Sequence, residues 1–228
     1  KKNIMKNMHK KIVVFDLDGT LLDTLEDIRR ALNYALSAYD FPLISKEKAR
    51  IYVGNGLRNA LTKAVLESKK RIDEDDFLLM YQLLLSSYKK HPAENTVAYS
   101  GIFDLLRELE NKGIKVGIAS NKNGEIVRSI VKEKLPFSFS FVLGQGDGYP
   151  LKPNTEGIMA KLKEEDISLA EAIYVGDSEV DKQTAENLGS SYFIVNYGFR
   201  TKEELEEKGI TNTLGSVKEL KKAIFDII

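Results

Sequence analysis

Five short apolar runs alternate with amphipathic stretches along this chain, and this alternation limits the fold more than any other feature. The runs are rich in Val, Ile and Phe, as buried strands are, and they lie at residues 12–15, 114–119, 139–143, 172–175 and 192–195. Helical spacing of apolar residues marks the stretches at 103–112, 125–134, 156–164 and 180–188. The sequence therefore predicts an α/β fold with a doubly wound parallel sheet. In such sheets, ligands bind beyond the carboxyl ends of the strands.

The alternation is interrupted once, between the first and second runs. From Thr24 to about Asn95 the chain shows only helical periodicity, punctuated by turn or capping signals at 40–42, 54–56 and 73–75. We predict an all-helical cap inserted after the first strand. The predicted core comprises residues 1–22 and 96–228, and the predicted cap comprises residues 23–95. Two linkers would then join cap and core, and such linkers can act as hinges.

Composition limits the partners that this chain is expected to have. Its 34 Lys and Arg residues match its 34 Asp and Glu residues, so no net field favours nucleic acid or an anionic membrane. No segment approaches the roughly 20 apolar residues of a membrane-spanning helix, and cysteine is absent, which excludes disulfides and thiol catalysis. We expect a cytoplasmic protein that acts on a small molecule, with no nucleic acid and no membrane partner. The Lys-rich start is interpreted as a solvated arm rather than a binding tail, and it has no long apolar stretch, so it is not expected to be a secretory signal. It contains Lys1, Lys2, Lys6, Lys10 and Lys11.

Acidic side chains follow the first predicted strand. Asp16 and Asp18 leave this strand one residue apart, and Gly19 permits a tight turn whose amides can face an anion. Two carboxylates in a buried position repel one another unless a cation or a shared proton offsets their charge. Carboxylate oxygens are ligands that suit Mg²⁺. A helix-capping Asp followed by a turn Asp is the alternative interpretation of this pair alone.

Two further segments suggest phosphate binding. Ser120 and Asn121 follow the strand at 114–119, where a hydroxyl and the first amides of a helix can bind a phosphate or simply cap the helix. Lys152 stands beside Pro153 and can act as a point charge on a phosphoryl oxygen. Taken alone, it is interpreted as a solvated loop lysine.

The fourth segment places acids where the strand at 172–175 gives way to a helix. Asp177 is the candidate metal ligand of this segment. Asp181 is either a partner of that ligand or a favourable charge in the first turn of the helix.

In their order and spacing, the four segments resemble the four motifs of the haloacid dehalogenase-like hydrolase superfamily, from residue 12 to about residue 224. The resemblance implies a Rossmann-like core with a cap, and Asp16 as a nucleophile that forms an aspartyl-phosphate. It implies that Asp18 protonates the leaving group and then activates water. The implied Mg²⁺ ligands are a carboxylate oxygen of Asp16, the backbone carbonyl of Asp18 and the side chain of Asp177, with Asp181 behind them. The implied phosphate-binding residues are Thr20, Ser120, Asn121 and Lys152.

Asp18 also separates reaction classes within this superfamily. Its dehalogenases lack an acid at this position, because they have no leaving alcohol to protonate. The resemblance therefore favours hydrolysis of a small-molecule phosphate ester. All four motifs are present, which argues against a catalytically inactive phosphometabolite-binding protein, the alternative from a different functional class.

The expected substrate rests on the cap. The runs at 51–57 and 196–198 resemble phosphoglycolate phosphatases, so 2-phosphoglycolate is the leading candidate. β-Phosphoglucomutases carry a histidine where this chain has Ile28, which makes a mutase less expected. Pyrophosphatase, nucleotidase and sugar-phosphate phosphatase activities stay open, as does the choice between monomer and homodimer. Candidate substrate contacts, with an ordinary interhelical turn as the alternative, are Gly54, Asn55, Gly56 and Arg58.

Overall fold

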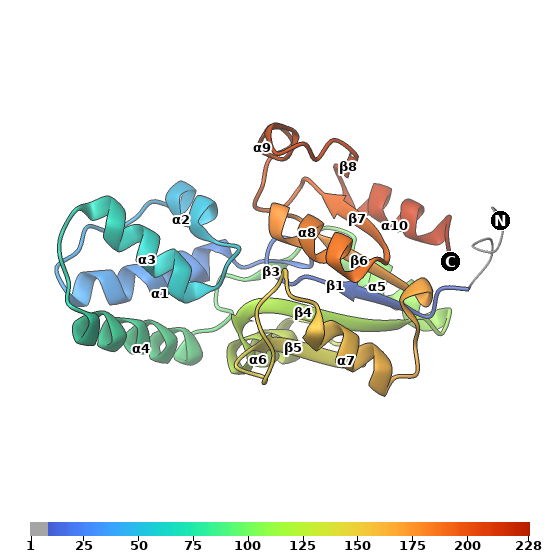
Figure 1. The fold of residues 1–228 in the computed structure, drawn as a ribbon, viewed down its shortest axis with the longest axis horizontal. Coiled ribbons are helices and arrows are strands. Elements are labelled where there is room, and N and C mark those ends of the chain that lie inside the picture. Colours follow the sequence, from blue (N-terminus) through green and yellow to red (C-terminus); the bar gives the residue numbers. More distant parts are fainter. Residues whose placement is uncertain (1–8) are drawn as a thin grey trace.

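The computed structural model describes residues 9–228, and in this range an α/β core carries a purely helical part at one end (Figure 1). Six strands of the described range form one parallel sheet in the order β5-β4-β1-β6-β7-β8. The central position of β1 buries all four of its residues completely. The strands are β1 (Ile12–Phe15), β4 (Lys115–Asn123), β5 (Phe141–Gln145), β6 (Ala172–Gly176), β7 (Ser191–Val195) and β8 (Thr213–Leu214).

Helices cover both faces of this sheet, as the alternating pattern predicts. Val13 and Phe15 pack into a cluster with residues of α5, α6 and α10, whereas Ile12 and Val14 pack into a second cluster with residues of α7 and α8. Successive residues of a strand point to opposite faces, so β1 contributes to both layers. The predicted fold class is confirmed. The core helices are α5 (Ile102–Asn111), α6 (Gly124–Lys134), α7 (Glu156–Glu164), α8 (Glu179–Leu188), α9 (Lys202–Glu207) and α10 (Val217–Phe225), with a 3₁₀ turn, η1 (Leu169–Glu171).

The interruption in the alternation corresponds to four helices that lie beside the sheet. Local signals define them well: in α4 the side chain of Asp73 caps the amino end, three acids occupy the first turn, and Lys89 and Lys90 occupy the last. These helices form the cap described below. They are α1 (Leu25–Ala38), α2 (Lys46–Tyr52), α3 (Leu57–Ser68) and α4 (Glu74–Lys90).

A short ribbon joins the cap to the core. Strand β2 (Leu22–Asp23) pairs antiparallel with β3 (Val97–Ala98), so the two linkers run side by side. The sequence did not predict these strands, because two residues are too few to show a period. The predicted domain boundaries at 22/23 and 95/96 fall at this ribbon, and the division into two domains stays a prediction.

The amino-terminal lysines differ from the predicted arm where the structure describes them. Lys10 Nζ donates to Ala170 O at 2.7 Å and to Ser191 Oγ at 2.9 Å, and Lys11 pairs with Glu171 at 2.6 Å. These two lysines are therefore attached to the core, and the arm interpretation is wrong for them. The other three lysines of the predicted arm, Lys1, Lys2 and Lys6, lie outside the described residues.

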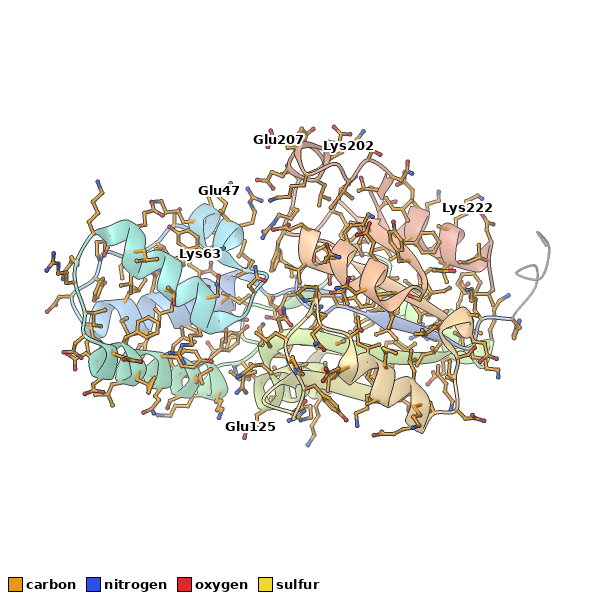
Figure 2. All side chains as sticks on the ribbon, in the orientation of Figure 1. Glu47, Lys63, Glu125, Lys202, Glu207 and Lys222 are labelled. Atoms are coloured by element: carbon orange, nitrogen blue, oxygen red, sulfur yellow. The ribbon has the colours of Figure 1, made fainter. Side chains whose placement is uncertain are left out.

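Side chains of both charges project from the surface of cap and core alike. Figure 2 labels examples, and among them Glu47, Glu125, Glu207, Lys202 and Lys222 are exposed. Within residues 9–228, none of the helices combines the length and the apolar character that crossing a membrane requires.

Candidate active site

Asp16 lies directly beyond the carboxyl end of β1, in the middle of the sheet. Its backbone N–H donates to Val175 O at 2.8 Å, so the residue is still held by β6 while its side chain leaves the strand. Gly19 follows with φ +81°, and a Cβ at this position would lie 2.2 Å from Asp177 Oδ2. Only glycine permits this close approach. The turn therefore brings the first motif against the fourth.

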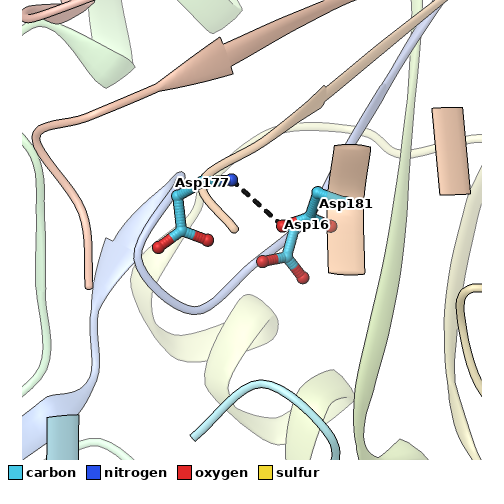
Figure 3. A group of neighbouring side chains, drawn as sticks. All are labelled: Asp16, Asp177 and Asp181. Carbon is cyan, nitrogen blue, oxygen red and sulfur yellow. Dashed lines mark hydrogen bonds between the residues drawn. The ribbon is translucent and has the colours of Figure 1, made fainter. Parts of the chain in front are cut away.

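Three buried carboxylates meet at this edge of the sheet. One oxygen each from Asp16, Asp177 and Asp181 lies within 4.8 Å of the others (Figure 3). Lys152 Nζ lies 2.9 Å from Asp16 Oδ1 and 3.0 Å from Asp181 Oδ1. Three carboxylates against one ammonium leave two negative charges, which a divalent cation would offset.

The pKa shifts of the cluster point to the same need for a cation. Burial, and next the charge of Asp181, raise the pKa of Asp16 to about 7, against the opposing charge of Lys152. Burial, followed by the charges of Asp16 and Asp181, holds the pKa of Asp177 well above its ordinary range. A cation at these oxygens would favour the ionised forms. Since all the donors are carboxylates, the site fits Mg²⁺.

Asp181 differs from the other two acids because both of its oxygens already accept hydrogen bonds. Oδ1 accepts from Tyr174 Oη at 2.6 Å and from Lys152. Oδ2 accepts from Asp177 N at 3.0 Å, the dashed line of Figure 3, and from Ser178 N and Oγ in the capping box that starts α8. Asp181 therefore orients Asp177 and Lys152, and its position behind the metal ligands stays a prediction.

Lys152 is buried between Asp16 and Asp181. Burial by itself lowers the pKa of Lys152, but the charges of the two acids outweigh it and hold this pKa well above its ordinary value. The side chain is therefore a buried cation directed at Asp16, and it is not a solvated loop lysine.

The side chain of Asn121 forms hydrogen bonds with the backbone of two other loops, which the sequence does not predict. Its side chain accepts from Lys152 N at 2.8 Å, donates to Lys152 O at 3.0 Å, and donates to Gly54 O in the cap loop at 3.3 Å. It thus fixes the backbone of the lysine loop, whereas the sequence predicts phosphate binding. Ser120, its neighbour, lines the pocket and accepts from Lys122 N at 3.1 Å.

Thr20, the remaining predicted phosphate contact, is fully buried and lies outside the pocket lining. Its hydroxyl donates to Asp177 Oδ1 at 3.4 Å. In this structure Thr20 therefore supports a carboxylate of the cluster.

A cavity of about 50 Å³ lies over these residues, between core and cap. Its core side carries the charged groups, including Asp16, Asp18 and Lys152. Its cap side is formed by apolar side chains and glycine backbone, from Ile28, Val53, Gly54, Gly56 and Leu57. The glycine loop therefore closes the pocket, with α3 beginning directly behind it.

Two predicted cap contacts do not reach this cavity. Asn55 and Arg58 are exposed and do not line it. The guanidinium of Arg58 lies 5.8 Å from the ring centre of Phe77 and 6.0 Å from that of Tyr81, because the first turn of α3 faces α4 there. Of the four predicted loop contacts, Gly54 and Gly56 line the pocket.

Two cationic residues that were not predicted from the sequence also line the pocket. Lys122 directly follows the second motif, and this adjacency was the available signal. Arg200 gave no signal, because a single arginine in a loop has no pattern. Its guanidinium pairs with Glu179 at 3.0 Å and donates to the cap carbonyls Arg50 O at 3.0 Å and Val53 O at 2.8 Å.

Comparisons with known proteins agree with this geometry. A family model described as haloacid dehalogenase-like hydrolase matches residues 13–195. A phosphoglycolate phosphatase of Vibrio parahaemolyticus is 30% identical over 215 residues, which cover 92% of this chain and 94% of that protein. Phosphoglycolate phosphatase 1 of Pseudomonas aeruginosa is 29% identical over 214 residues, covering 92% of this chain and 78% of that protein.

A solved structure shows the same arrangement of core and cap. The crystal structure of a proposed phosphoglycolate phosphatase from Lactobacillus delbrueckii subsp. bulgaricus superposes with a TM-score of 0.88 at 30% identity, covering 95% of this chain and 99% of that one. The family match extends over most of the chain, and the four motifs meet at one pocket. This chain therefore belongs to the haloacid dehalogenase-like hydrolase family, as its motifs predicted.

Proposed function

We propose that this chain is a Mg²⁺-dependent phosphatase that hydrolyses a small phosphate monoester through an aspartyl-phosphate on Asp16. The observation that carries this proposal is the convergence of Asp16, Lys152 and Asp177 at the carboxyl end of the central strands, with Asp18 in the same pocket. A nucleophile, a fixed cation, a metal site and a proton donor are the groups that phosphoryl transfer requires.

In the first step, an oxygen of Asp16 forms a bond to phosphorus while the bond from phosphorus to the ester oxygen breaks. Asp18 gives its proton to the departing oxygen, so an alcohol leaves. In the second step, Asp18 takes a proton from water as the water oxygen attacks phosphorus and the bond from phosphorus to the Asp16 oxygen breaks. The carboxylate of Asp16 and inorganic phosphate are released.

The negative charge of the phosphoryl group would be stabilised by side chains that are already held in place before the substrate binds. Lys152, held by Asp16 and Asp181, would meet a phosphoryl oxygen together with the hydroxyl of Ser120. Asp16 and Asp177 would hold Mg²⁺ with the backbone carbonyl of Asp18, and the bound ion would neutralise charge on the phosphoryl group.

The leading candidate substrate is 2-phosphoglycolate. Relatives that are about 30% identical are named for this activity, and the small, partly apolar cavity favours a compact leaving group over a nucleoside. The proposed enzyme works as a monomer or homodimer. A cytoplasmic location stays an expectation from composition.

The first test is hydrolysis of p-nitrophenyl phosphate with and without Mg²⁺, comparing the wild type with Asp16→Asn. We expect Mg²⁺-dependent turnover that Asp16→Asn abolishes, since an amide oxygen cannot form the aspartyl-phosphate. Normal turnover in this variant would contradict the mechanism.

A substrate panel then separates the remaining functions. It contains 2-phosphoglycolate, pyrophosphate, nucleoside monophosphates and sugar phosphates, and the highest kcat/KM identifies the class. An inactive binding protein would turn over none of these compounds, although it could still bind one in calorimetry.

A further inference from the structure

Lys122 occupies a position between core and cap to which the motifs assign no role. It lies near the end of β4 and is only 4% exposed. Its ammonium donates to Asp18 Oδ1 in the core and to Tyr88 Oη at 2.6 Å in cap helix α4. The same ammonium lies 4.8 Å from the ring centre of Tyr88, which is itself 1% exposed. One buried cation therefore connects Asp18 with the cap.

The two oxygens of Asp18 have different surroundings. Oδ1 accepts from the Lys122 ammonium and also from the Thr24 hydroxyl. Oδ2 has no hydrogen-bond partner among residues 9–228. Two donors on one oxygen restrict rotation of the carboxyl group. Oδ2 is left as the oxygen that is available to the reacting groups.

Fold stability alone does not explain a buried lysine, because a buried ion pair seldom stabilises a fold more than apolar side chains would. Lys122 lines the reaction pocket and contacts an acid that proton transfer requires. Tyr88 lies on a different part of the chain and presents both its hydroxyl and its ring face to the same ammonium. This geometry suits a group that fixes the direction of another side chain.

We propose that Lys122 is a positioning residue that orients the proton-transferring carboxyl of Asp18, and that Tyr88 holds Lys122 in place from the cap. This inference rests on the proposed function. As the bond from Asp16 to phosphorus forms and the ester bond breaks, Oδ2 of Asp18 delivers its proton to the leaving oxygen. Lys122 exchanges no proton in this step.

The test compares two leaving groups, because only a poor leaving group depends strongly on proton delivery. p-Nitrophenolate departs readily without a proton, whereas the alkoxide of an alkyl phosphate such as glycerol 2-phosphate does not. Lys122→Met removes the ammonium and keeps the chain length. We expect kcat for the alkyl phosphate to fall about 100-fold and the burst rate of p-nitrophenol release to fall less than about 10-fold.

Tyr88→Phe gives a milder second variant, because it keeps the buried ring and removes the hydroxyl. We expect a loss of about 3- to 10-fold that is again larger for the alkyl phosphate, with KM nearly unchanged. Lys89→Met is the matched control. Lys89 is the next residue of α4 and also pairs cap with core, at 2.8 Å from Glu125, but it does not line the pocket. Glu125 is exposed and is labelled in Figure 2. The Lys89→Met variant should keep the wild-type ratio of the two rates.

Three outcomes would overturn the proposal. Equal losses on both substrates would indicate a general structural role. A raised KM with unchanged kcat would mean that Lys122 binds the substrate directly. An unchanged rate ratio in Tyr88→Phe would refute the part played by the cap. If Lys122→Met fails to fold in a thermal melt, Tyr88→Phe decides alone. Failure of the proposed function is distinguishable, because the wild type would then hydrolyse neither ester or Asp16→Asn would remain active.

Discussion

At the scale of single residues, the carboxylate cluster predicts a direct link between Mg²⁺ and stability. Because Mg²⁺ would bind the folded site, at a concentration 100-fold above its Kd it should raise the free energy of unfolding by about 2–3 kcal/mol. Asp177→Asn removes a proposed ligand and one charge of the repelling set, so it should abolish this increase. Urea unfolding with Mg²⁺ and with EDTA measures the effect. Asp147→Asn, a control in the loop that pairs with Arg128, should keep the wild-type response; equal responses in both variants would exclude this Mg²⁺ site.

The residues that sequence reasoning found and missed differ in one physical respect. Asp16, Lys152 and Asp177 each follow a strand and Ser120 lies near the end of one, and the ends of parallel strands must meet at one edge of the sheet. Their convergence could therefore be predicted. The contact between Lys122 and Tyr88 depends on how the cap approaches the core, which no local pattern encodes. The same holds for the side chain of Asn121, which spans from one core loop to a cap carbonyl.

At the scale of elements, α2 of the cap is joined to the core by Arg50. Its guanidinium donates to both carboxylate oxygens of Glu204 in α9, each at 2.8 Å, and to Phe199 O at 2.6 Å. These hydrogen bonds lower the pKa of Glu204 to about 2. A carboxyl whose pKa falls on folding stabilises the protein above its unfolded pKa of about 4.5, and this contribution is lost as pH falls toward 2.

Because the pKa of Glu204 falls on folding, the ion pair with Arg50 should stabilise the protein more at neutral than at acidic pH. Glu204→Gln should lower the free energy of unfolding by about 1 kcal/mol at pH 7, a modest amount because solvent screens the partly exposed pair. At pH 3 the difference from the wild type should be smaller. Urea unfolding at the two pH values measures this difference. Glu207 is an exposed acid at the end of α9, and Glu207→Gln is the control that should have no effect. A difference that is the same at both pH values would contradict the role of this ion pair.

Strands β1, β4 and β6 were predictable because each carries at least two β-branched residues, although β4 continues to Asn123, beyond the predicted end at residue 119. The residues beyond that end are Ser120, Asn121, Lys122 and Asn123, polar side chains that carry no strand signal. Strands β2, β3 and β8 have two residues each and form because longer elements bring them together. Tertiary contacts decide these boundaries.

At the scale of the whole molecule, cap and core share one continuous cluster of buried apolar side chains. It includes Leu32 and Leu61 from the cap helices and Val13 and Ile126 from the core. We therefore expect cap and core to unfold together, although the pocket lies between them. Leu61→Ala should cost about 2–5 kcal/mol through the lost methyl groups and the cavity left behind. Hydrogen exchange under rising denaturant should then show amides of α1–α4 and of β1 opening with the same free energy, both reduced equally by the substitution. If the cap amides instead open at a lower denaturant concentration than those of β1, the cap is a separately folding domain. It would then be joined to the core through the β2–β3 ribbon and the polar contacts of Arg50 and Lys122.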